Sequence, residues 1–440
     1  MTKSQRIDIP FRKHLLSNGL QVIIHEDHSC PLAAVNLWYH VGSKNEVAGR
    51  TGFAHLFEHL MFEVSKHFGT TYFELLQKAG GQINGSTDTD RTNYWELVPS
   101  NAVELPLWME ADRMRYMLPS LTAAAFETQR DVVLNERRQN YENRPYGMAM
   151  IALAAALFPP DHPYHWNTIG APADLLCATL EDVQAFFRQF YHPANASLAI
   201  AGDINADAVL ELVDQYFGTC PAGPAPRPVA QAPSRAIPAR LILEDRVELP
   251  RLYAAWLTPA IYADGDADLD LASEILGGGK PSRLYRRLVY DERIATDVSA
   301  SQNSRELGGF GAIIVTAVPG VGLDLVERVV AGELETFARE GPGRDELDRA
   351  KALNETAFVS RLQRVGGFGG RSDQLNSYNV WRGDPGYFAS DLDRYRRATT
   401  QSIRQAVARH LTPDGQVMLS VVPAGHPELA VTGSTPVEVS

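Results

Sequence analysis

The first half of the chain alternates between short β-type patterns and helical patterns. Residues 20–25 and 33–40 are rich in β-branched and aromatic side chains, which predicts two strands joined by a polar turn. Residues 72–79 place apolar side chains at helical spacing and stop at two glycines, and residues 82–87 and 92–98 then predict two more strands. Helices and strands mixed in this way predict an α+β fold.

Residues 53–62, FAHLFEHLMF, differ from their surroundings because three polar side chains interrupt an otherwise apolar helical run. Glu58 and His59 follow His55 by three and four residues, so the three side chains share one helix face. Polar groups carried into a protein interior are costly unless a partner satisfies them. The pattern fits a Zn²⁺ site in which His55 and His59 are ligands and Glu58 is the general base for an activated water. The alternative is two unrelated core histidines, each bonded to a backbone carbonyl.

A second helical pattern, over residues 121–141, places Glu136 on the same face as small and apolar side chains. An acidic side chain on such a face needs a partner. Glu136 could be a third metal ligand, or it could lie at the edge of the apolar face and pair with Arg137 or Arg138. From the residues alone, the ion pair is the simpler interpretation.

Composition narrows the class of protein. The 440 residues, 45% of them hydrophobic, can bury at least two sizeable cores, and the net charge of −12 argues against nucleic-acid binding. Cys30, Cys177 and Cys220 are too few and too scattered for a disulfide framework or a cysteine zinc site. The sequence has no signal-peptide pattern and no apolar run long enough to span a bilayer. We therefore expect no membrane or nucleic-acid partner and a cytoplasmic location, or a periplasmic one if a leader was removed.

The chain is divided near its middle. Residues 220–238 are rich in Pro and Ala without an apolar period, which predicts a linker between a domain at 1–219 and a domain at 239–440. The second part looks like a degraded copy of the first, because residues 241–260 and 22–41 both read strand, acidic turn, proline, strand. No histidine occurs where the copy of the metal-binding helix should lie. Only the first domain can therefore carry the metal.

Two glycine clusters occur in the second half of the chain. Residues 277–279 lack the spacing of a phosphate-binding loop and predict a turn that ends a helix. Residues 366–370 fall inside a helical region and predict a break in that region, with no role that the sequence assigns.

The HxxEH helix and the segment ETQRDVVLNE together resemble the pitrilysin or insulinase family of zinc peptidases, which includes mitochondrial processing peptidase and half-length bacterial members. Glu136 lies 77 residues after His59, as the family's third zinc ligand would. The resemblance implies Zn²⁺ held by His55, His59 and Glu136, with Glu58 as base. It also implies two tandem homologous α/β sandwich domains, each a sheet with helices packed on one face. Gln129 stands where many members have a further glutamate, which changes the surroundings of the metal but leaves its ligands in place.

The same resemblance implies a zinc-dependent endopeptidase that cuts short or unfolded peptides inside a chamber closed by two half-length chains. Residues 82–87 are expected to bind the peptide as an added strand, with Asn84, Gly85 and Ser86 as contacts. From the residues alone, a plain solvated edge strand is the simpler interpretation of this segment.

One feature of the family is missing from this sequence. Members use an arginine and a tyrosine of the half without zinc to hold the substrate, and the matching positions here are Val289 and Thr296, which cannot do so. Arg371 and Tyr378 have the same spacing in a different context, which we interpret as coincidence. We therefore expect the catalytic subunit of a heterodimer, with a second homologous half-length chain supplying the arginine and tyrosine. The alternatives are a noncatalytic structural or assembly subunit and a zinc hydrolase with a non-peptide substrate.

Overall fold

The computed structural model describes residues 7–63, 65–69, 71–225, 229 and 236–439. The chain forms two compact units, each assembled from three segments. The first unit comprises Met1–Asn135, Asn167–Ala230 and Ala357–Ser390, and the second comprises Glu136–Trp166, Gln231–Thr356 and Asp391–Ser440. Residues 226–228 and 230–235 of the predicted linker lie outside the described part of the chain. Within that part, no helix is both long and apolar enough to cross a bilayer.

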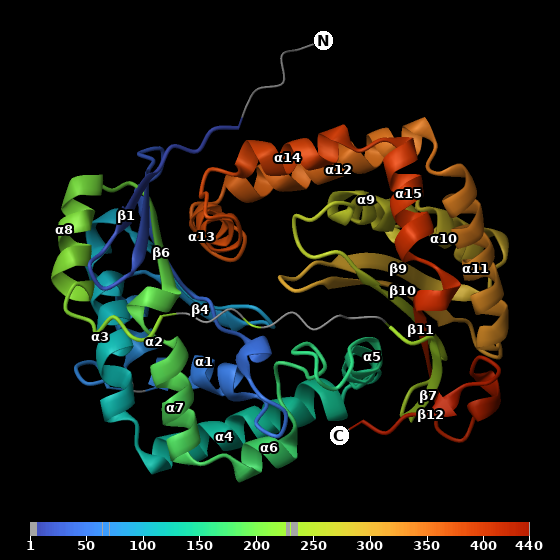
Figure 1. Ribbon diagram of the computed structural model, residues 1–440, viewed down its shortest axis with the longest axis horizontal. Coiled ribbons are helices and arrows are strands. Elements are labelled where there is room, and N and C mark those ends of the chain that lie inside the picture. Colours follow the sequence, from blue (N-terminus) through green and yellow to red (C-terminus); the bar gives the residue numbers. More distant parts are fainter. Residues whose placement is uncertain (1–6, 64, 70, 226–228, 230–235, 440) are drawn as a thin grey trace. The chain divides into compact units, whose positions relative to one another are not determined.

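The first unit contains a six-stranded sheet in the order β1–β2–β6–β3–β5–β4 (Figure 1). Strands β2 and β6 are parallel, and the other neighbours are antiparallel. The bounds are Arg12–Leu15 for β1, Gln21–Glu26 for β2, Leu32–Tyr39 for β3, Gln82–Thr87 for β4, Thr92–Pro99 for β5 and Ala196–Gly202 for β6. The four strands predicted from residues 20–98 agree with these bounds to within one residue at each end.

Seven α-helices of the described chain begin in the first two segments of the first unit. They are α1 Phe53–Glu63, α2 Tyr72–Lys78, α3 Glu104–Ser120, α4 Ala123–Arg137, α6 Pro172–Cys177, α7 Leu180–Phe190 and α8 Ala206–Phe217. Helices α1 and α2 pack against β4, α3 packs against β3, and α8 packs against β2. Local capping fixes several starts: Thr179 forms a capping box with Asp182 at α7, and Asn205 accepts a hydrogen bond from the Ala208 amide at α8.

The second unit repeats this sheet. Its order is β12–β7–β11–β8–β10–β9, in which β7, β11, β8, β10 and β9 take the places of β2, β6, β3, β5 and β4. The parallel pair recurs as β7 and β11. The bounds are β7 Ala239–Asp245, β8 Arg251–Thr258, β9 Ala295–Asn303, β10 Gly309–Ala317, β11 Gln416–Pro423 and β12 Thr435–Pro436. The predicted α+β fold with two similar sheet-and-helix domains is therefore confirmed.

The remaining helices complete the two units. They are α5 Ala149–Leu157, α9 Asp266–Gly277, α10 Arg283–Tyr285, α11 Leu323–Glu340, α12 Arg344–Leu362, α13 Arg371–Arg382, α14 Phe388–Arg397 and α15 Thr400–His410. Helix α9 ends at the first glycine cluster, and the second cluster separates α12 from α13, as the sequence predicts. The main apolar core of the second unit lies between α9, α11, α15 and one face of its sheet.

Each sheet also receives a helix from the other half of the sequence. Helix α5 packs against β8 and β11 of the second sheet, where Leu153 and Leu157 join a core with Leu419 (Figure 1). Helix α13 packs against β2, β3 and β6 of the first sheet, where Asn376 Nδ2 donates to the Asn36 carbonyl at 2.8 Å. The compact units therefore exchange one segment each, relative to the domains predicted at 1–219 and 239–440. Helices also cover the second face of each sheet, in addition to the one face that the sequence predicts.

Candidate metal centre

Helix α1 carries the three polar residues of the HxxEH motif on one side. Six apolar side chains of the helix are buried: Phe53, Ala54, Leu56, Phe57, Leu60 and Met61. His55, Glu58 and His59 are only half-buried. The two imidazole rings lie edge to face, with centroids 4.8 Å apart and an interplanar angle of 82°. The apolar side of α1 therefore fixes the helix in the unit, while its polar side reaches a space that solvent can enter.

Glu136 lies at the same place. One ligand atom each from His55, His59 and Glu136 lie within 4.8 Å of one another, and no other such group of three occurs in the described part of the chain. Glu136 is the penultimate residue of α4, and every earlier residue of that helix belongs to the first unit. Asn140 Nδ2 donates to Glu136 Oε1 at 3.3 Å. Two imidazoles and one carboxylate are a donor set of catalytic zinc sites, in which a fourth position stays open.

Glu58 lies near two buried tyrosines, close enough for its charge to raise the pKa of each. Burial, and after it nearby charged groups that include Glu58, raises the pKa of Tyr94 well above its usual value. Burial and Glu58 act in the same direction on the pKa of Tyr191. Both phenols are therefore neutral at physiological pH. The Glu58 carboxylate stands beside them as an ionisable group that can accept a proton.

Glu46 holds the beginning of α1, and the sequence analysis did not identify it. Its carboxylate accepts hydrogen bonds from the Gly52 amide at 2.9 Å and from the Ala54 amide at 2.8 Å. These amides belong to the first turn of the helix, where backbone donors have no partner within the helix. Burial raises the pKa of Glu46 to about 8, in spite of these hydrogen bonds. The side chain therefore caps α1 from a site that disfavours its own charge.

Arg113 of α3 holds the other end of α1. Its guanidinium donates to the Met61 carbonyl at 3.5 Å and stacks over the ring of Tyr94 at 3.9 Å. Arg113 Nε also donates to Glu110 Oε2 at 2.8 Å, within a bidentate pair. Arg113 and Glu110 are both fully buried. A buried pair of this kind is expensive to break, because removing one partner leaves the other charge unpaired.

A second buried acid completes this cluster without adding a charge. Burial, and after it the Glu110 carboxylate, raises the pKa of Glu96 well above its usual value. The Tyr72 hydroxyl donates to Glu96 and lies 3.2 Å from Glu110 Oε1. With Glu96 protonated, the cluster contains one cation and one anion. It joins α2, α3 and β5 directly beneath the end of the HxxEH helix.

Strand β4 lies at the edge of the sheet beside α1. A Cβ on Gly85 would approach the Phe62 ring to 2.9 Å, so the absence of a side chain there lets α1 lie close to the strand. Asn84 is exposed. The Ser86 hydroxyl donates to Asn93 Oδ1 at 2.7 Å, and Arg91 donates to the Ser86 carbonyl at 2.8 Å. Of the three predicted substrate contacts, Gly85 thus has a clear packing role, and only Asn84 is exposed, with its Oδ1 accepting a hydrogen bond from the Gly85 amide at 2.8 Å.

Val289 and Thr296 stand where the family has its arginine and tyrosine, and both contact other residues of the second unit. Val289 packs against the core of the second unit, and the Thr296 hydroxyl donates to the Thr316 carbonyl at 3.2 Å. The other candidate pair is also engaged elsewhere. Arg371 forms an ion pair with Asp27, and Tyr378 is fully buried. Neither pair offers an exposed guanidinium with an exposed phenol.

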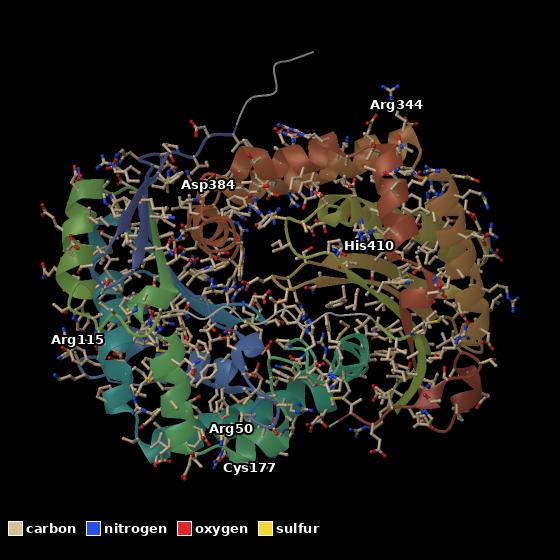
Figure 2. All side chains as sticks on the ribbon, in the orientation of Figure 1. Arg50, Arg115, Cys177, Arg344, Asp384 and His410 are labelled. Carbon is tan, nitrogen blue, oxygen red and sulfur yellow. The ribbon has the colours of Figure 1, made fainter. Side chains whose placement is uncertain are left out.

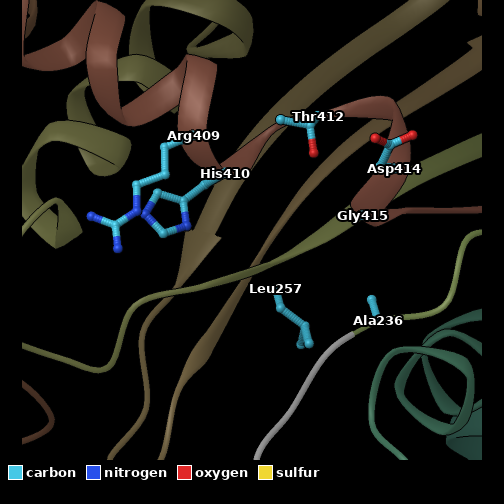
Figure 3. Close-up of a pocket in the computed structure, with 7 residues that line it drawn as sticks. All are labelled: Ala236, Leu257, Arg409, His410, Thr412, Asp414 and Gly415. Carbon is cyan, nitrogen blue, oxygen red and sulfur yellow. The ribbon is translucent and has the colours of Figure 1, made fainter.

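A pocket of about 220 Å³ opens in the second unit (Figure 3). It is lined by Ala236, Leu257, Arg409, His410, Thr412, Asp414 and Gly415. Burial, and after it Arg409, lowers the pKa of His410. The pocket offers one imidazole and one carboxylate, which falls short of the three-ligand set on α1 and α4.

The buried pair at Arg113 should decide the stability of the first unit. We expect Arg113→Met to lower the free energy of unfolding by about 3–5 kcal/mol, because Glu110 keeps a buried charge without its partner. Arg115→Met is the matched control, since Arg115 lies on the surface of the same helix (Figure 2). The control should change stability by less than about 0.5 kcal/mol. Denaturant unfolding of the metal-free protein measures both, and equal effects would contradict the role given to Arg113.

Glu46 should make stability depend on pH. Its pKa is about 8 in the folded protein against an ordinary value of 4.5, so the folded state keeps a proton that the unfolded state releases. Its contribution is complete below pH 4.5 and is lost as the pH rises to about 8, with a slope of up to about 1.4 kcal/mol per pH unit. Glu46→Gln should therefore gain stability relative to wild type across this range. Denaturant unfolding of both metal-free proteins from pH 5 to 8 measures the difference, and a constant difference would show that Glu46 stays ionised.

Comparison with known proteins agrees with this arrangement. Residues 21–159 match the family described as Insulinase (Peptidase family M16), and residues 178–354 match the Peptidase M16 inactive domain. The chain is similar to the zinc protease PqqE of Helicobacter pylori, with 29% identity over 79% of each chain. It is also similar to an uncharacterized zinc protease of Mycobacterium tuberculosis, with 26% identity over 91% of this chain and 90% of the relative.

A solved protease structure from Helicobacter pylori has the same fold. It matches with a TM-score of 0.86 and 24% identity, over 95% of this chain and 100% of that one. The two matched family segments together cover more than half of the sequence and include the HxxEH helix and Glu136. The chain is a half-length member of the M16, or pitrilysin, family of peptidases.

Proposed function

We propose that this chain is the catalytic subunit of a zinc-dependent endopeptidase that hydrolyses short or unfolded peptides. The observation that supports the proposal is the approach of His55, His59 and Glu136 to within 4.8 Å, with Glu58 on the same helix face. The names of similar proteins, which are zinc proteases, support the same metal. Neutral imidazoles and a carboxylate are ligands that Zn²⁺ accepts.

In this proposal each of the four residues has one task. His55, His59 and Glu136 hold the metal, which when bound polarises the scissile carbonyl and lowers the pKa of water. Glu58 accepts the proton of the attacking water and then delivers it to the amine that leaves, so the side chain ends the cycle ionised. Tyr94 and Tyr191, which are buried near Glu58, stay neutral and add no charge to the site.

The peptide is proposed to add as a strand to the open edge of β4, in contact with Asn84, Gly85 and Ser86. No described strand pairs with the outer edge of β4, which is the end of the sheet. Main-chain hydrogen bonds to such an edge give affinity with little sequence preference. The close packing of α1 at Gly85 brings that edge and the polar face of the helix into one region.

A second half-length chain is proposed to complete the enzyme. The proposal is supported by the contacts of four side chains: Val289 packs in a core, the Thr296 hydroxyl is hydrogen-bonded, Arg371 is ion-paired and Tyr378 is buried. None of them can hold a substrate as the family's arginine and tyrosine do. The partner would supply those two residues and close the chamber with this chain. A noncatalytic assembly subunit is the alternative, and it predicts no hydrolysis under any condition.

Removal of single site residues tests the catalytic proposal. Glu58→Gln should retain zinc and lower kcat by about 10²- to 10⁴-fold, the usual contribution of a general base. His55→Ala and Glu136→Gln should lose zinc as well as activity. Metal content and peptide turnover are measured on the same preparations, with Glu63→Gln on the same helix as the control. An active Glu58→Gln would refute the assigned base, and an inactive wild type that binds zinc would favour the assembly subunit.

Mixing experiments test the proposed partner. The purified chain should bind zinc but turn over peptides slowly, and a homologous half-length chain that carries the arginine and tyrosine should raise kcat/KM by about 100-fold or more. The matched control is the same partner with the arginine changed to alanine and the tyrosine changed to phenylalanine, which should not activate. Full activity of the chain alone would refute the heterodimer.

A further inference from the structure

The glycine cluster at residues 366–370 lies against the face of the first sheet that is opposite to α1. A Cβ on Gly366 would approach Ala34 Cβ to 2.8 Å and Leu97 Cδ1 to 3.4 Å, so this loop runs directly over β3 and β5. Gly85 faces α1 together with Tyr94, and side chains alternate along a strand. Leu97 and its neighbours on the loop side therefore point away from the HxxEH helix.

The loop is held in place by polar contacts. Asp373, at the start of α13, accepts hydrogen bonds from the Gly369 amide at 2.7 Å and from Trp38 Nε1 at 2.8 Å. Arg364 Nη2 donates to the Phe368 carbonyl at 3.1 Å. The contacts of the Gly369 amide and the Phe368 carbonyl hold the peptide group between Phe368 and Gly369, and on the other side of Phe368 the Gly370 amide donates to the Gly367 carbonyl at 3.0 Å.

Phe368 is an exposed aromatic residue in this fixed loop. Its side chain is 38% exposed, and its ring lies edge to face with Trp95, with centroids 5.6 Å apart. Trp95 on β5 is only half-buried. Its partner across the strand pair is Asn84 on β4, which is exposed and has a short side chain. Trp95 therefore borders the edge strand on this face, and Phe368 contacts Trp95.

We propose that Phe368 and Trp95 form a subsite for a large apolar side chain of a peptide that pairs with β4. The inference rests on the proposed function, since it needs an extended peptide on that edge. Residues of the added strand that stand beside Asn84 point to the same face as Trp95, because paired residues of neighbouring strands share a face. Such a side chain passes over Asn84 and reaches the two rings, whereas its neighbours in the peptide point to the α1 face.

The chemistry of the subsite selects aromatic and long aliphatic side chains. The exposed Phe368 ring and the half-buried Trp95 ring offer apolar area that an alanine side chain cannot reach, and ring pairs prefer edge-to-face contacts of the kind already present between Phe368 and Trp95. Peptides bound by backbone contacts alone would show no preference at any position. This subsite adds one preferred position to an otherwise tolerant strand site.

The test uses one unstructured peptide that the wild type cuts, with phenylalanine or alanine placed at each position in turn. We expect phenylalanine to raise kcat/KM by about tenfold at one fixed position relative to the cleaved bond. Phe368→Ala should abolish that preference and leave kcat/KM for the alanine peptide within about twofold, and Phe368→Leu should keep part of the preference. Phe73→Ala is the matched control, because Phe73 is 42% exposed on α2, beside Phe62 on the α1 face.

A binding assay separates this inference from the proposed function. The dissociation constants of the same peptides are measured on zinc-loaded Glu58→Gln protein, with and without Phe368→Ala. A preference that is lost with Phe368→Ala supports the subsite even if the wild type hydrolyses none of the peptides. A preference that survives Phe368→Ala, one lost equally in Phe73→Ala, or no preference at any position would each overturn it.

Discussion

Helix α1 is fixed at both ends by side chains that are themselves fully or almost fully buried. Glu46 accepts the amides of the first turn, and Arg113 donates to the Met61 carbonyl in the last turn. The geometry of the site depends on this, because His55 and His59 move with the helix while Glu136 comes from α4. A rotation of α1 by one residue would turn both imidazoles by about 100° and separate the three ligands.

Holding α1 in this way places charged side chains in the interior. The cluster of Arg113, Glu110 and Glu96 keeps the number of those charges small. Arg113 and Glu110 form a pair, Glu96 is kept protonated by burial and by Glu110, and Tyr72 donates to Glu96. The arrangement satisfies most polar atoms with one cation and one anion. An apolar core of the same volume could be as stable, but it would have no donor for the carbonyl at the end of the helix. The charged cluster therefore contributes orientation as well as stability.

The sequence predicted the elements that are built locally and missed those that depend on distant partners. Strands and helices of the first unit follow from alternation and helical periodicity, and the strand at residues 82–87 was predicted with its observed bounds. Periodicity alone left Glu136 undecided, because a helix pattern shows its face but not what faces it. Glu46 gave no signal, since it caps α1 from a loop seven residues ahead of the helix. A capping box would have been recognisable, and this carboxylate is too far along the chain to form one.

Arg113 was missed for a related reason. Helix α3 buries Glu110, Asp112 and Arg113 together with its apolar residues, so its pattern of polar and apolar positions does not show which face is inside. The exchange of α5 and α13 between the two sheets cannot be predicted either, because the residue pattern of a helix does not specify which sheet it covers. Phe368 illustrates the consequence for function. It lies more than 250 residues after Trp95 in the chain, and only the return of α13 to the first sheet brings the two rings together.

The two sheets also show why the candidate metal centre occurs at only one of two corresponding helices. Helix α9 follows β8 as α1 follows β3, but its polar residues find partners within the second unit. Asp266 pairs with Arg394 at 2.9 Å, and the Tyr395 hydroxyl donates to Asp270 Oδ2 at 2.6 Å. Burial raises the pKa of Asp270 to about 7, so this acid is partly protonated near neutral pH. In the copy without histidines, ion pairs and hydrogen bonds satisfy the buried polar groups that a metal would otherwise have to satisfy. The candidate metal ligands are therefore confined to α1 and α4 within the described part of the chain.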